Sequence, residues 1–159
     1  IDVEDFPVPM PGLITDILVS MDDKYLYFSN WLHGDLRQYD ISDPSSPKLT
    51  GQVWMGGLLG KAPEVNGRSV DGAPQMIQLS LDGQRLFVTT SLFSTWDNQF
   101  YPSMKDKGGI MLIVDCDVEN GGMKIREDFH IDFGNEPHGP ARAHETRYPG
   151  GDCSSDIWV

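Results

Sequence analysis

Four histidines have the clearest potential for chemistry in this sequence: His33, His130, His138 and His144. None of them pair at the i, i+2 or i, i+4 spacing of a compact metal motif, and no CxxC or HExxH pattern occurs. His130 alternates with apolar strand residues, which favours an outward, solvated position, and His138 lies in a turn-like EPHGP stretch. His33 and His144 lie in loops that follow strand-like segments. Imidazole is a common ligand of copper, zinc and iron, so these two are candidate metal ligands. A structural hydrogen-bonding role is the equally weighted alternative.

The two cysteines offer weaker chemistry. Cys153 follows Asp152, and a neighbouring carboxylate raises a thiol pKa and lowers its nucleophilicity. Cys116 alternates within the strand-like LIVDCDV. We therefore expect both to serve in packing. Two cysteines permit one disulfide at most, so a reducing, cytosolic setting is the simpler interpretation.

An internal repeat indicates the elements that would position these side chains. ITDILVSMDDKYLYFSN (14–30) aligns with PQMIQLSLDGQRLFVTT (74–90) at an offset of about sixty residues. Each copy consists of a strand, an Asp-Asp or Asp-Gly turn and a β-branched, aromatic strand, which is typical of a hairpin. Two further strands follow each hairpin, so four-stranded units are expected near 14–57 and 74–134.

Tandem four-stranded antiparallel units are typical of β-propeller blades. We predict an all-β fold, a partial β-propeller of about two blades plus a closing segment over 141–159. A β-sandwich of about eight strands is the alternative, but it does not require the repeat. Residues 64–72 are expected to form a polar loop and residues 91–108 a long loop, while Trp54, Trp96 and Trp158 are expected in the blade core. Because two blades cannot close a ring, the remaining blades are expected in a longer protein.

Charge and composition exclude some classes of function. The formal net charge is −12, which argues against nucleic acid as a partner because phosphate binding needs Lys and Arg. No apolar run reaches the roughly 18 residues of a transmembrane helix. The chain opens on an acidic stretch without an initiator Met, so we expect it to begin inside a longer protein.

With these residues in view, the chain resembles the C-terminal third of the selenium-binding protein family, whose members act as methanethiol oxidases. Three long stretches carry the resemblance: 14–57, 72–102 and AHETRYPGGDCSSDIWV (143–159). The resemblance implies a seven-bladed propeller, selenium binding, copper dependence and a small-molecule thiol substrate. It also implies His33 and His144 as copper ligands, with further ligands and the selenium-attachment cysteine upstream.

The reaction implied by the resemblance converts methanethiol, O2 and water into formaldehyde, hydrogen sulfide and hydrogen peroxide. These 159 residues alone would leave such a site unassembled. The alternative function is a non-enzymatic propeller scaffold that binds selenium or takes part in transport, because a fold does not determine a function.

Overall fold

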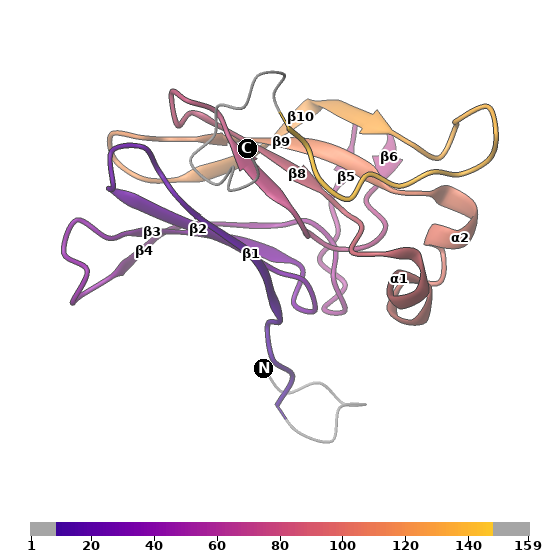
Figure 1. The fold of residues 1–159 in the computed structure, drawn as a ribbon, viewed down its shortest axis with the longest axis horizontal. Coiled ribbons are helices and arrows are strands. Elements are labelled where there is room, and N and C mark those ends of the chain that lie inside the picture. The colour runs from indigo at the N-terminus through magenta and orange to yellow at the C-terminus, as the bar shows by residue number, and fades with distance from the viewer. Residues whose placement is uncertain (1–8, 148–159) are drawn as a thin grey trace.

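The computed structural model describes residues 9–147, and antiparallel sheets dominate this part of the chain (Figure 1). The first sheet has the order β1-β2-β3-β4 and the second the order β10-β9-β8-β7. The strands of the first sheet are β1 (Ile14–Val19), β2 (Tyr25–Asn30), β3 (Asp35–Asp40) and β4 (Lys48–Trp54). Those of the second are β7 (Ile77–Leu79), β8 (Arg85–Thr89), β9 (Ile110–Cys116) and β10 (Met123–Asp132).

These sheets confirm the all-β class, and each has four strands, the first within residues 14–54 and the second within residues 77–132. Each sheet is a meander in which every strand pairs with the next one along the chain. The sheets do not close into a ring within residues 9–147, so the propeller stays a prediction. Residues 141–147 form no strand, and the rest of the expected closing segment, including Cys153 and Trp158, lies outside the described residues.

The same turn begins the second strand of both repeats. Ser20 and Ser80 each donate a hydroxyl hydrogen bond to the aspartate two residues later, at 2.5 Å. The same hydroxyls accept from the backbone N–H of Tyr25 and Arg85. The turn places its fourth residue in the left-handed region, and Gly83 has a φ of 72° there. This geometry explains why Asp-Asp and Asp-Gly are interchangeable, because Asp and Gly both tolerate that region.

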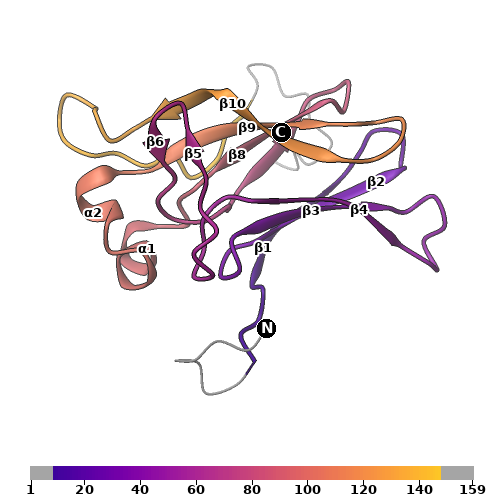
Figure 2. The same ribbon diagram turned by 180° about the vertical axis from the view of Figure 1, so that it is seen from behind.

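The core lies between the two sheets, which converge face to face in Figures 1 and 2. Alternate strand residues point into it, as the period of two requires. The fully buried members include Tyr27, Leu36, Leu86 and Leu112. The Tyr27 hydroxyl accepts a hydrogen bond from the buried Gln38 side chain, so these two polar groups are paired within the core.

Polar contacts also join the two sheets. The Asp16 carboxylate on β1 accepts from the backbone N–H of Ile77 on β7 at 2.8 Å. At the other end, the Lys24 ammonium donates to the carbonyl oxygens of Val118 and Glu119. The Gln38 side chain accepts from the N–H of Gly122 at 2.7 Å. The sheets are therefore held together across their edges as well as through the core.

The expected long loop between β8 and β9 contains two short helices, α1 (Ser94–Phe100) and α2 (Met104–Lys107). The α1 helix covers Trp31, which is fully buried, with Phe100 and Tyr101 at ring-centroid distances of 5.0 and 5.1 Å. Trp96 on α1 makes an edge contact with Trp31 at a ring-centroid distance of 6.5 Å, but it is 44% exposed, so its prediction as a blade-core residue is wrong. Neither helix has the length or apolar character of a membrane span within residues 9–147.

The region from 64 to 72 contains a small hairpin in place of the expected loop. Its strands are β5 (Glu64–Val65) and β6 (Arg68–Ser69), and they stand beside β10 in Figure 2. Val65 is buried in the same core as the sheets. The hairpin forms because Asn66 and Gly67 both adopt positive φ, which the two-residue turn requires.

A backbone crossing supports the turn that carries His33. Gly34 has a φ of 87°, and a Cβ at this position would lie 2.0 Å from the carbonyl oxygen of Gly56. A Cβ on Gly57 would lie 2.4 Å from the carbonyl oxygen of His33. Only glycine allows the two chain segments to approach this closely.

Candidate functional site

His33 is held in the interior where β2 ends. The residue is 8% exposed, and Nε2 lies 2.9 Å from the backbone carbonyl oxygen of Met10. A carbonyl only accepts, so Nε2 must carry the proton. The neutral ring then has its lone pair on Nδ1, which is buried without a hydrogen-bond partner. A buried, unpartnered imidazole nitrogen is a feature expected of a ligand position.

His144 lies at the surface, and its two ring nitrogens have the reverse roles of those in His33. Its Nδ1 lies 2.7 Å from the carbonyl oxygen of Leu92, so Nδ1 donates and the neutral ring keeps its lone pair on Nε2. The backbone of the residue is fixed as well, because the Thr89 hydroxyl donates to the His144 carbonyl oxygen at 2.5 Å. Burial raises the pKa of Asp16 on β1 above its ordinary value of 3.8. The electrostatic interaction of Asp16 with His144 acts in the opposite direction.

A buried carboxylate lies behind His144. Asp97 on α1 is completely buried and accepts from the Ser91 hydroxyl at 2.6 Å and from the Leu92 N–H at 3.1 Å. It also forms an ion pair with Arg142 at 3.2 Å. A buried charge needs such partners, because the desolvation cost of an unpaired carboxylate is several kcal/mol.

A pocket of about 430 Å³ opens beside His144. It is lined by Ser91, Leu92, Phe93, Ser94, Arg142 and His144. Apolar surface from Leu92 and the half-exposed Phe93 therefore adjoins an imidazole and a guanidinium. This combination could admit a small, partly apolar molecule beside the His144 side chain.

The described residues hold these two candidate ligands separately. His33 does not line the pocket beside His144. Within residues 9–147, no three His, Cys, Asp or Glu side chains gather into a possible metal group. A site built on His33 and His144 would therefore need further donors.

Of the remaining candidates, Cys116 and His138 have structural positions and His130 does not match its prediction. Cys116 is a free, buried thiol, and burial raises its pKa to about 12, in agreement with its predicted packing role. His138 lies in an exposed turn, as predicted. His130 differs from its prediction, because it is half-buried and its Nδ1 has no hydrogen-bond partner.

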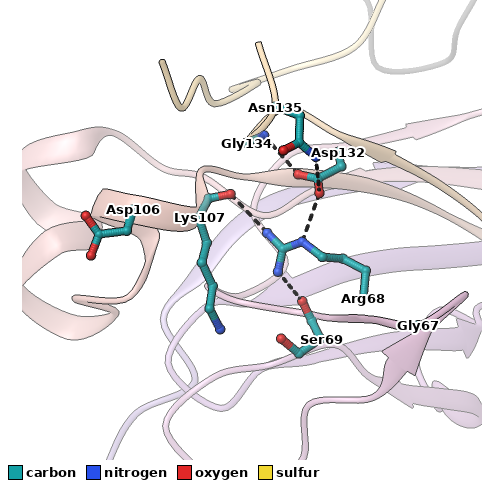
Figure 3. Close-up of a pocket in the computed structure, with 8 residues that line it drawn as sticks. All are labelled: Gly67, Arg68, Ser69, Asp106, Lys107, Asp132, Gly134 and Asn135. Carbon is teal, nitrogen blue, oxygen red and sulfur yellow. Dashed lines mark hydrogen bonds and ion pairs between the residues drawn. The ribbon is translucent and has the colours of Figure 1, made fainter.

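A second pocket, of about 330 Å³, lies between the β5–β6 hairpin, α2 and the end of β10 (Figure 3). The Arg68 guanidinium forms ion pairs with Asp71 and Asp132 at 2.8 and 3.0 Å, and it donates to the carbonyl oxygens of Ser69 and Lys107. The guanidinium N–H groups of Arg68 donate to these acceptors, so Arg68 fixes the hairpin to the second sheet. We assign this pocket a structural role.

Sequence reasoning missed Asp97 and Arg142. The two residues are 45 positions apart, and neither lies in a motif that predicts their pairing. The only local signal was the position of Arg142 two residues before His144.

Comparisons with known proteins identify the family. The sequence model of the 56 kDa selenium-binding protein family (SBP56) matches residues 1–159. A methanethiol oxidase of Rattus norvegicus is 60% identical over 167 residues, which cover 94% of this chain and 35% of that protein. Selenium-binding protein 1 of Arabidopsis thaliana is 55% identical over 175 residues, or 99% of this chain and 36% of that protein.

The fold has a counterpart among solved structures. A hypothetical selenium-binding protein from Sulfolobus tokodaii superposes with a TM-score of 0.79 at 47% sequence identity, covering 93% of this chain and 31% of that chain. This chain thus spans about a third of the length of its relatives. Because the family model matches the whole sequence and the relatives above are 55% and 60% identical to it, the chain belongs to the SBP56 selenium-binding protein family.

Proposed function

We propose that the full-length protein is a methanethiol oxidase, in which this chain supplies two blades of a β-propeller. The reaction consumes methanethiol, O2 and water and gives formaldehyde, hydrogen sulfide and hydrogen peroxide. The identity of 60% to the rat and human proteins named methanethiol oxidase supports this assignment. The two four-stranded meanders agree with the blade arrangement. The remaining blades, which are the partners of these sheets, would come from the rest of the protein.

The site we propose is a copper centre to which His33 and His144 contribute nitrogen ligands. One observation carries the proposal: in each imidazole a backbone carbonyl accepts from one ring nitrogen and leaves the other nitrogen with its lone pair. Metal-bound histidines commonly have this arrangement, in which the outer hydrogen bond fixes the tautomer and the ring direction. Two neutral imidazoles suit copper, so these residues fit the group.

A bound copper ion would supply a soft acceptor for the thiolate sulfur and a redox centre for O2. The chain's own residues would present Nδ1 of His33 from the interior and Nε2 of His144 beside the pocket. Leu92 and Phe93 would offer apolar surface to the methyl group of the substrate. Selenium binding accords with the family's name. Cys116 is poorly suited to attach selenium, because its thiol is buried and its pKa is raised to about 12.

Metal analysis of single variants tests the proposal. In the full-length protein, His33→Asn and His144→Asn should each lower the copper content per protein and the release of peroxide from methanethiol. His138→Asn is the matched control, because His138 lies in an exposed turn. Unchanged copper content in both ligand variants would exclude the site. A well-folded wild-type protein without metal or activity would favour the scaffold function.

A further inference from the structure

We propose that Asp97 is a positioning residue that sets the tautomer and direction of the His144 ring. Asp97 does not touch His144. It acts through two segments, the backbone around Leu92 and the side chain of Arg142. The proposal concerns the ring in the protein itself, and its bearing on copper rests on the function proposed above.

The first connection runs through the acceptor of His144. The carbonyl oxygen of Leu92 accepts from Nδ1 of His144. The Asp97 carboxylate accepts from the Leu92 N–H and so fixes the backbone next to this carbonyl. On the other side, the backbone N–H of residue 97 donates to the carbonyl oxygen of Phe93 at 3.0 Å, a bond that any side chain at this position would retain. Ser91, which precedes the segment, donates its hydroxyl to the same carboxylate. The direction of the Leu92 carbonyl therefore depends on Asp97.

The second connection runs through the chain that carries His144. Arg142 precedes His144 by two residues, and its side chain is 11% exposed. One terminal nitrogen of its guanidinium donates to Asp97, and the other donates to the side-chain oxygen of Asn98 at 2.6 Å. Asp97 therefore connects α1 both to Arg142, which precedes His144, and to Leu92, whose carbonyl oxygen accepts from the His144 ring.

The two connections converge on one chemical property of the ring. As long as Leu92 presents its carbonyl, the proton stays on Nδ1 and the lone pair on Nε2. If the carbonyl turns away, the neutral ring is free to exchange between its two tautomers. A buried carboxylate with three hydrogen-bonding partners is well suited to this task, because hydrogen bonds to an ionised group are stronger than those between neutral groups.

Histidine nitrogen spectroscopy without metal tests the proposal. In full-length protein labelled with 15N-histidine, the His144 signal is assigned by its loss in His144→Asn. The wild-type ring should show one tautomer, protonated at Nδ1. Asp97→Asn retains the size of the side chain but removes its charge, and it should convert His144 to a mixture of both tautomers. Arg142→Gln retains the contact between Asp97 and Leu92 and should give a smaller change.

His33 is the internal control, because its Nε2 proton is held by Met10 and does not depend on Asp97. Its signal should be unchanged in Asp97→Asn. Asp115→Asn is the matched charge control, since Asp115 pairs with Arg126 at the surface. An unchanged His144 tautomer in Asp97→Asn would overturn the proposal, and so would equal changes at His144 and His33, which would indicate general unfolding.

The copper measurement is separate from this test. If His144 is a ligand, Asp97→Asn should weaken copper binding by about 10-fold or less, below the roughly 10–100-fold range for losing a direct hydrogen-bond partner, because Asp97 acts on the ring only through Leu92 and Arg142. A tautomer change in a protein that binds no copper would support the positioning role and refute the copper site. A normal tautomer in Asp97→Asn together with normal copper binding in the wild type would refute the positioning role and support the copper site.

Discussion

The crossing of Gly34 over Gly56 allows one substitution to be predicted in detail. In Gly34→Ala the new methyl group would lie 2.0 Å from the Gly56 carbonyl oxygen and 2.6 Å from the Cα atom of Gly57. Backbone lies on that side, so no flexible side chain can yield. One of the two segments must move, and Gly34 directly follows His33.

Two costs contribute to the expected loss of stability. An L-residue at a φ of 87° costs about 1–2 kcal/mol, the penalty of left-handed backbone. Overpacking against a fixed neighbour costs about 1–3 kcal/mol more. The free energy of unfolding should therefore fall by about 2–5 kcal/mol, which is a large part of the stability of an ordinary domain.

Gly67→Ala provides the matched control, because Gly67 has a φ of 75° and no atom within 4 Å of an added Cβ. It should incur only the conformational cost. Urea unfolding of both variants gives the comparison, with the m-value checked for constancy. If Gly34→Ala is no more destabilising than Gly67→Ala, the reasoning from the backbone crossing is refuted.

Three further predictions concern the ion pairs of Arg68, the partly buried Asp16 and the buried thiol of Cys116. Arg68→Gln should lower the free energy of unfolding by about 1–3 kcal/mol, because Asp71 and Asp132 lose a part-buried partner, and limited proteolysis should then cut the β5–β6 hairpin. Burial raises the pKa of Asp16, so the folded state favours its protonated form; stability should fall as pH rises from 3.8 through the raised pKa, and urea titrations of Asp16→Asn should lack this component. Iodoacetamide should modify Cys116 only on unfolding, since burial raises its pKa to about 12; peptide mass spectrometry would detect earlier modification, which would contradict the buried position.

The parts of the fold that the sequence predicts well depend on local chemistry. The hairpins at 14–30 and 74–90 were predictable because Ser20 and Ser80 each stand two residues before an aspartate that completes the turn. The alternation of apolar residues then indicates which face of each strand is buried. Both signals lie within a few residues of the structure that they specify.

The helix α1 was not predictable by the same means. It has seven residues and no side-chain cap, so it would be marginal in isolation. Its stability comes from distant contacts, chiefly the packing of Phe100 and Tyr101 on Trp31 and the hydrogen bond from the Tyr101 hydroxyl to the Trp31 carbonyl oxygen. The pattern of apolar residues within α1 cannot indicate this packing, because Trp31 lies far away in the sequence.

The candidate site was predictable only in its residue types. His33 and His144 could be selected as imidazoles in loops, but the nitrogen that each leaves free depends on Met10 and Leu92, which are 23 and 52 positions away. Asp97 was missed for the same reason. A carboxylate in a long loop is usually solvated, and only the fold reveals that this one is completely buried.

The contacts between the two sheets have a consequence for how the protein melts. Repeat architectures lose their all-or-none character when neighbouring units are weakly coupled. Here one continuous core contains side chains from both sheets, and polar contacts bridge them as well: Asp16 contacts β7, while Lys24 and Gln38 contact the turn between β9 and β10. Neither sheet can detach without exposing the buried face of the other, so both repeats should denature in one concerted calorimetric transition.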